Sequence, residues 1–139
     1  MSEAPEIENY ARARGIAEGG FAEVLGAQCI SVSNDCVQVR MPWHARLGVE
    51  RIHGGAISAL VDVAATAAFW ARPGLGPDSR GATVGFSISF TRLSARTDLI
   101  ATATVRKRGG SICFGEVSVK NAAGDEVAFA TITYKLQAA

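Results

Sequence analysis

The chain has 139 residues, and its 14 Lys and Arg nearly balance its 13 Asp and Glu, for a formal net charge of +1. This length suits one domain with a real hydrophobic core, and the balanced charge gives no electrostatic reason to expect DNA or RNA as a partner. Hydrophobic residues make up 48% of the sequence. That fraction is at the upper edge for a globular domain, so part of the apolar surface is expected in a subunit interface.

The cysteines and the apolar stretches argue against disulfide-rich, zinc-binding, secreted and membrane-spanning proteins. Cys29, Cys36 and Cys113 are odd in number and form no C-x-x-C pair, so we expect neither a disulfide framework nor a zinc site and interpret all three as small buried strand residues. The N-terminus lacks the apolar run of a signal peptide. Residues 56–70 are too short for a membrane span and contain Asp62. We therefore expect a cytoplasmic protein without membrane contact.

The N-terminal part predicts one helix and one hairpin. Residues 5–19 are typical of an amphipathic helix that ends at a glycine pair, so 1–20 form an N-terminal helical segment. Apolar residues alternate over 27–32 and over 36–41, with Ser, Asn and Asp between them, which predicts a β-hairpin. A loop follows over 42–52.

The central segment predicts a buried helix over about 54–71. It is apolar nearly all round, which is typical of a helix buried on most sides. The run 72–77, with two prolines and two glycines, ends the helix.

The remainder predicts strands. Alternating apolar residues mark 82–93, 98–108, 111–120 and 126–136, and short glycine-containing turns join the last three into an antiparallel meander. Short strands before a long buried helix and long strands after it favour the α+β class, with one antiparallel sheet wrapped around the helix. Since nothing divides the chain, residues 1–139 are expected to form a single domain.

Asp62 is the one charged residue of the central helix, and burying a charge without a partner is costly. Its neighbours at four-residue spacing are Ser58 and Thr66, so this helix face is small and slightly polar and leaves room for a ligand. Asp62 is therefore a candidate catalytic acid. The alternative is a structural acid that caps a loop or pairs with an arginine.

The helix begins with His53-Gly54-Gly55. The first amides of a helix lack internal partners and carry the positive end of its dipole, so they suit a carbonyl oxygen that develops negative charge. Alternatively, the glycines only permit a tight turn and His53 packs or caps.

The helical rise separates these two features. Gly54 and Asp62 are eight residues apart, or about 12 Å along the axis, whereas a catalytic contact needs roughly 3 Å. If both residues act on one carbonyl, Asp62 must come from a second subunit's antiparallel helix across a two-fold interface.

Other polar residues are weaker candidates. Thr83 could hydrogen-bond the Asp62 carboxylate or a water, or be an ordinary strand residue. Arg106 and Arg108, with Arg92 nearby in sequence, could hold phosphates at the mouth of a site, or lie at a solvated hairpin end.

The segment from His53 to Asp62 resembles the H-G-G-x-x-x-x-L-x-D motif of hotdog-fold acyl-CoA thioesterases of the PaaI-like family, which includes phenylacetate-pathway and 4-hydroxybenzoyl-CoA thioesterases. Residues 84–92, 106–109 and 124–128 resemble the family's later strands and turns. The resemblance covers about 27–136.

This resemblance implies a hotdog fold, a homodimer with a continuous sheet that is often paired into a tetramer, and hydrolysis of an acyl-CoA without a metal or other cofactor. Carried over, Asp62 matches the nucleophile or general base, Gly54 the oxyanion amide and His53 the residue that shapes the loop. Thr83 matches a Ser/Thr position that assists the water or the acid.

The chain departs from the family at two places. Many relatives have Asn or Gln six residues before the motif histidine, where this chain has Leu47. Arg46, His44 and Glu50 are candidates to occupy that space. The usual proline after the downstream strand is replaced at 93–94 by Leu-Ser.

The sequence thus predicts an acyl-CoA thioesterase without saying which acyl group it uses. Substrate contacts are expected from the following residues: Gly55, Ser58, Thr66, Arg92, Arg106 and Arg108. The alternative is a non-catalytic protein that binds or senses acyl-CoA, against which the acid at the helix centre argues. A hotdog hydratase is a weaker third interpretation.

Overall fold

The computed structural model describes residues 3–139, with side chains from residue 10 onward. The helices are α1 (Glu3–Glu18), α2 (Phe21–Leu25) and α3 (Gly54–Trp70), with a 3-10 turn η1 (Ala45–Leu47), and the strands are β1 (Gln28–Ser33), β2 (Cys36–Met41), β3 (Arg80–Phe90), β4 (Leu99–Arg108), β5 (Ile112–Asn121) and β6 (Glu126–Gln137).

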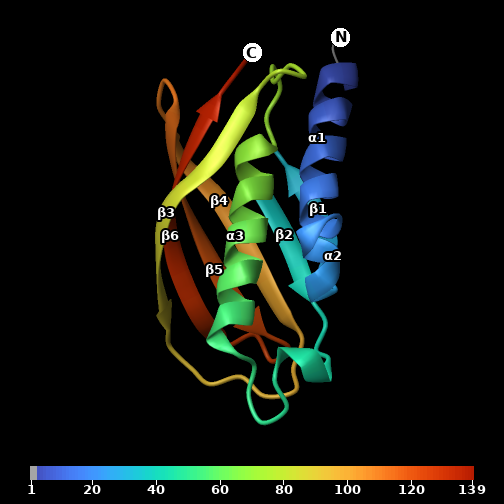
Figure 1. The fold of residues 1–139 in the computed structure, drawn as a ribbon, viewed down its shortest axis with the longest axis vertical. Helices are drawn as coiled ribbons and strands as arrows, with labels where there is room; N and C mark the ends of the chain where they lie inside the picture. Colours follow the sequence, from blue (N-terminus) through green and yellow to red (C-terminus); the bar gives the residue numbers. More distant parts are fainter. Residues whose placement is uncertain (1–2) are drawn as a thin grey trace.

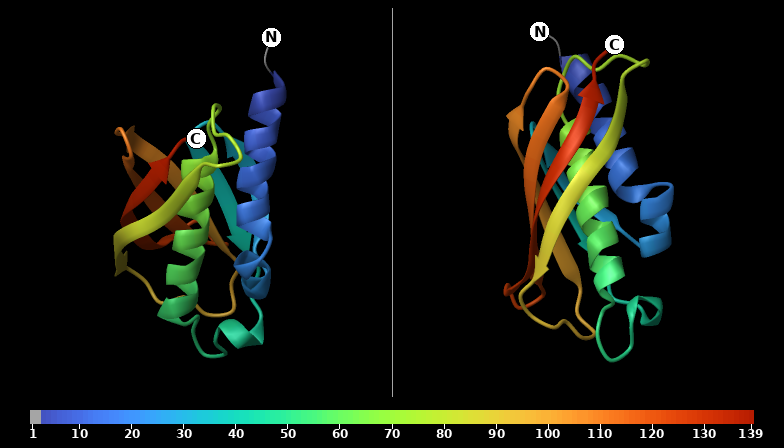
Figure 2. Two further views of the ribbon diagram at one scale, coloured as in Figure 1. Left: turned by 45° about the horizontal axis from the view of Figure 1, so that its top comes forward. Right: turned by 60° about the vertical axis from the view of Figure 1, so that its left-hand side comes forward.

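One antiparallel sheet of six strands, in the order β1-β2-β4-β5-β6-β3, curves around α3. The β1–β2 hairpin and the β4–β5–β6 meander confirm the predicted pairings. All the helices lie on the same side of the sheet (Figure 2), with α1 running alongside α3 next to the hairpin (Figure 1). The predicted α+β fold with one central helix is therefore confirmed.

Two features of the fold were not in the sequence prediction. The short helix α2 follows directly on α1, and β3 pairs with β6 at the far edge of the sheet, away from the strands next to it in the chain. The other long edge of β3 has no strand beside it within residues 3–139.

The core lies between α3 and the concave face of the sheet. Ten of the seventeen residues of α3 are buried, as its apolar composition predicted. Small residues of the sheet let the helix approach closely: a Cβ at Gly115 would come within 3.0 Å of the Phe69 ring. Phe69 in turn stacks on Tyr134 at a centroid distance of 4.8 Å. This close packing fixes the position of α3 against the strands.

The N-terminal helix packs against α3. Ala13 and Ala17 are fully buried, and the Arg12 guanidinium lies over the Trp70 ring at 5.0 Å. Arg12 also donates to the Gly76 carbonyl at 3.4 Å. These contacts hold α1, and the turn into α2, beside the central helix.

Arg108 caps the C-terminal end of α3. Its guanidinium donates to the carbonyls of Phe69 at 2.9 Å and Ala68 at 3.3 Å, and lies 2.9 Å from a carboxylate oxygen of Asp35. The last carbonyls of a helix lack internal partners and carry its negative end, so a cation there is stabilising.

Replacing Arg108 by Gln is expected to lower the free energy of unfolding by about 1–3 kcal/mol, because charged hydrogen bonds to the helix end are lost. Arg106→Gln is the matched control: Arg106 pairs with Glu116 at 3.5 Å, but both side chains are more than half exposed. Its change should stay within about 0.5 kcal/mol. Urea denaturation at one protein concentration measures both variants, and equal losses would contradict the capping role.

Candidate active site

Asp62 lies in the middle of α3, half-buried, and faces the edge strand β3. The Thr83 hydroxyl donates to Asp62 Oδ1 at 2.7 Å. Among the side chains of residues 10–139, Thr83 alone hydrogen-bonds this carboxylate, and no arginine pairs with it. The alternative of an acid paired with an arginine is therefore not what the structure shows, and Oδ2 is left available to a ligand.

In the described part of the chain, the start of α3 leaves one backbone N–H free. His53 is the N-cap residue, and its Nδ1 accepts a hydrogen bond from the Gly55 N–H at 2.8 Å. A Cβ at Gly55 would lie 2.9 Å from that nitrogen, so the glycine permits the cap. The Gly54 N–H has no hydrogen-bond partner among the described residues. Gly54 therefore offers the free donor of this turn, while the Gly55 donor is already used.

Each of these features lines its own cavity. Gly54 and His53 line a cavity of about 530 Å³ together with Phe90 and Arg92. Asp62 lines a smaller one of about 250 Å³. The two cavities share no lining residue, so one chain does not bring the amide and the acid together.

Two other residues of α3, Ser58 and Thr66, were predicted to contact the substrate, and they have different surroundings. Thr66 lines the Asp62 cavity. The Ser58 hydroxyl donates to the Gly54 carbonyl at 2.8 Å, one turn back along the helix, so its proton is already used. Of these two, Thr66 is the better placed for a substrate beside the acid.

The three predicted arginines lie apart. Arg92 lines the Gly54 cavity, as does Arg51, which the sequence analysis did not single out. Arg108 is engaged at the opposite end of α3, and Arg106 pairs with Glu116 on the exposed surface. Arg92 and Arg51 are thus the cations beside the free amide.

The loop before His53 explains the departure at Leu47. The Leu47 side chain is buried in the core, and its carbonyl accepts from the His53 N–H at 2.8 Å. Three residues were candidates to take the place of the Asn or Gln found in relatives. Glu50 lines the Gly54 cavity. His44 instead hydrogen-bonds the Leu25 carbonyl at 3.3 Å, and Arg46 is exposed.

Sequence reasoning missed a buried polar pair at the C-terminal end of α3, formed by Trp70 and Tyr134. Tyr134 stands opposite Thr83 across the β3–β6 pairing, and Trp70 Nε1 donates to its hydroxyl at 2.8 Å. Burial raises the pKa of the Tyr134 phenol above its usual range, Trp70 opposes this, and the negative charge of Asp62 adds to it. The phenol therefore stays protonated. Nothing in the local pattern marks this pair, because its members are 64 residues apart.

The cysteines all lie in strands, as predicted, although only Cys113 is fully buried. Burial raises the pKa of the Cys29 thiol, which disfavours the thiolate that a catalytic cysteine needs. Among the side chains of residues 10–139, no three His, Cys, Asp or Glu are grouped as metal ligands would be. No helix in the described part of the chain is long and apolar enough to cross a membrane.

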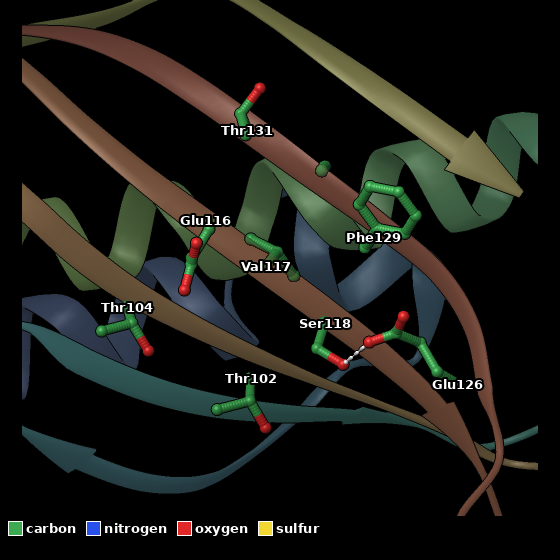
Figure 3. Close-up of a pocket in the computed structure, with 9 residues that line it drawn as sticks. Thr102, Thr104, Glu116, Val117, Ser118, Glu126, Phe129 and Thr131 are labelled. Carbon is green, nitrogen blue, oxygen red and sulfur yellow. Dashed lines mark hydrogen bonds between the residues drawn. The ribbon is translucent and has the colours of Figure 1, made fainter.

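A further cavity, of about 570 Å³, lies on the outer face of the sheet (Figure 3). Residues of β4, β5 and β6 line it, most of them on the outer face, and Ser118 donates to Glu126 at 2.6 Å. The sheet separates this cavity from α3, so it takes no part in the site at Asp62.

Comparison with known proteins agrees with this geometry. The model of the thioesterase superfamily matches residues 50–128. An inferred esterase of Halobacterium salinarum is 29% identical over 109 residues, which cover 75% of this chain and 72% of that protein.

Solved structures match over most of their length. The PaaI protein of the phenylacetic acid degradation operon of E. coli has a TM-score of 0.80 at 26% identity, covering 95% of both chains. Zebrafish thioesterase superfamily member 2 has a TM-score of 0.74 at 25% identity, covering 92% of this chain and 95% of that one. The chain therefore belongs to the thioesterase superfamily and has its hotdog fold.

Proposed function

We propose that this protein hydrolyses an acyl-CoA to a free acid and CoA at sites shared by two copies of the chain. Membership of the superfamily supports thioester hydrolysis in general. The finer proposal rests on one observation: a carboxylate held by Thr83 and a free Gly54 amide lie on one helix but in separate cavities.

A second copy would bring the two groups together. Gly54 and Asp62 are about 12 Å apart along α3, so a single carbonyl cannot contact both within one chain. An antiparallel α3 from a partner would place its Asp62 beside the first chain's Gly54, and two-fold symmetry would repeat the arrangement.

The edge strand β3 supports such a dimer. Nine of its eleven residues are exposed, and Phe86 and Phe90 are exposed by 39% and 50%. A long edge strand with unpaired backbone groups and exposed aromatic residues favours pairing with another chain. Pairing of two β3 strands would make one continuous sheet, and two such dimers could form a tetramer.

The chemistry follows from these groups. The thioester oxygen accepts the Gly54 N–H at the positive end of α3, which stabilises the negative charge of the tetrahedral intermediate. Thr83 holds Oδ1, which leaves Oδ2 of Asp62 for the reaction. In one route Oδ2 takes a proton from water, the hydroxide adds to the carbonyl carbon, and the proton passes to the sulfur as the C–S bond breaks. In the other route Oδ2 itself attacks the carbonyl carbon and expels the CoA thiolate. Water then cleaves the mixed anhydride, and its proton neutralises the thiolate.

The ends of the substrate would lie in different surroundings. Arg92 and Arg51 beside Gly54 suit the phosphates of CoA. The acyl group would lie near Asp62, against the small-residue face that includes Thr66.

A panel of acyl-CoAs with short, branched, aromatic and long acyl groups tests the proposal. Purified protein is expected to release free thiol from at least one of them, measured with a thiol reagent against a no-enzyme control. Micromolar binding of an acyl-CoA by calorimetry without any thiol release would instead favour the non-catalytic binding protein.

A further inference from the structure

We propose that the turn between α1 and α2 forms one wall of the acyl pocket at Asp62, and that Phe21 on this turn selects compact apolar acyl groups. The inference rests on the proposed thioesterase function, to which it adds a specificity-determining residue from outside the superfamily-matched segment, 50–128.

The cavity at Asp62 has two walls. Asp62, Val63 and Thr66 of α3 form one, and the α1–α2 segment forms the other through the following residues: Ile16, Gly19, Phe21 and Ala22. Asp62 is the one ionisable side chain in this lining. If the thioester carbonyl reacts at Asp62, its acyl group must lie within a few ångströms of that carboxylate. The surface beside the carboxylate is mostly apolar, which suits an acyl group.

Phe21 stands out in this wall because it lines the cavity and is still 62% exposed. A ligand that fills the cavity would cover part of this ring and remove apolar surface from water. Val24, one turn further along α2, is 73% exposed but does not line the cavity. Comparing variants at Phe21 and Val24 therefore distinguishes the effect of contact with the cavity from the effect of an exposed apolar side chain.

The backbone places Phe21 firmly. Gly20 adopts φ 55° and ψ −125°, a conformation that suits glycine, and a Cβ at Gly19 would lie 2.8 Å from the Gly15 carbonyl oxygen. On the far side of Phe21, Ala22 and Leu25 are buried in the core. The turn is thus anchored at both ends, and its aromatic ring is a preformed part of the cavity wall.

The cavity is open to solvent on one side, and its size favours compact acyl groups. Its volume is about 250 Å³, whereas a cavity of about 150 Å³ is enough to bind benzene. An acyl group about the size of an aryl ring would fit between Val63 and Phe21 and touch both walls. A long straight chain would have to leave the cavity past Phe21 into solvent, and acetyl would leave the ring of Phe21 untouched.

The test compares Phe21→Ala with Val24→Ala as the matched control, using benzoyl-CoA, decanoyl-CoA and acetyl-CoA. Removing the ring should lower kcat/KM for benzoyl-CoA by about tenfold or more, mainly through KM, and change the value for acetyl-CoA by less than about twofold. The ratio of decanoyl-CoA to benzoyl-CoA turnover should therefore rise. Val24→Ala should match the wild type on all three. Equal kinetics of Phe21→Ala and the wild type on benzoyl-CoA, or an equal loss in Val24→Ala, would overturn the inference.

Binding separates this inference from the proposed function. In an Asp62→Asn background, in which turnover should be too slow to disturb the titration, calorimetry with benzoyl-CoA is expected to show a Kd about tenfold weaker when Phe21 is also changed to Ala. If the wild type cleaves no thioester but this difference persists, the thioesterase proposal fails and the pocket assignment stands. If thioesters are cleaved and Phe21 affects neither turnover nor binding, the pocket assignment alone fails.

Discussion

Replacing Asp62 by Asn is expected to lower kcat for thioester hydrolysis by at least about a hundredfold. The amide can still accept the Thr83 hydrogen bond of 2.7 Å, so the fold should be preserved, but it can neither take a proton from water nor attack the carbonyl. Loss of a general base or a nucleophile typically costs at least this much. Thiol release at saturating acyl-CoA measures the change.

Thr83→Val provides the graded control for this result. Valine has the shape of threonine but lacks the hydroxyl that holds Oδ1, so a fall in kcat of about tenfold is expected, well short of the effect of Asp62→Asn. If Asp62→Asn kept more than a tenth of the wild-type kcat with unchanged circular dichroism, Asp62 would not be the reacting acid.

Gly54→Pro and Asp62→Asn, each nearly inactive alone, are expected to recover activity when the two variants are mixed. Gly54→Pro removes the N–H that is free at the start of α3, and proline is tolerated at the first position of a helix. The preceding His53 has φ −63° and ψ 136°, which is compatible with a following proline. The variant alone should lose about a hundredfold in kcat or more, as is typical when an oxyanion donor is lost.

Gly54→Ala controls for the added side-chain atoms. A Cβ at Gly54 would lie 3.3 Å from the Phe90 ring, so both substitutions meet this neighbour, but alanine keeps the N–H. We expect Gly54→Ala to retain much more activity than Gly54→Pro. An equal loss in both would point to the contact with Phe90 instead of the amide.

The mixing experiment tests whether each site takes residues from two chains. In a mixed dimer of Gly54→Pro with Asp62→Asn, one site keeps both intact groups and the other loses both. Random exchange of subunits by mild denaturation and refolding should therefore recover about a quarter of the wild-type activity. If each site lay within one chain, every chain would be defective and the mixture would stay inactive.

The sequence predicted the elements of the site better than their surroundings. The motif from His53 to Asp62 placed a capped helix start and a lone acid on α3, because both depend on residues close together in the chain. The Thr83 contact was one of two open interpretations, and the structure confirms the hydrogen bond to Asp62. Arg108 shows the limit of this reasoning: the sequence offered phosphate binding or a solvated hairpin end, but the chain folds so that Arg108 caps α3.

The same division holds for the fold. The apolar periodicities of this sequence by themselves determined the central helix, the hairpin and the meander, since period and turn chemistry are local properties of the backbone. Tertiary structure alone decided that β3 pairs with β6 at the edge of the sheet, that Tyr134 stands opposite Thr83 and bonds Trp70, and that Phe21 lines the cavity at Asp62. A local pattern states which face of an element is buried, but the partner that covers it is selected by packing among elements distant in the chain.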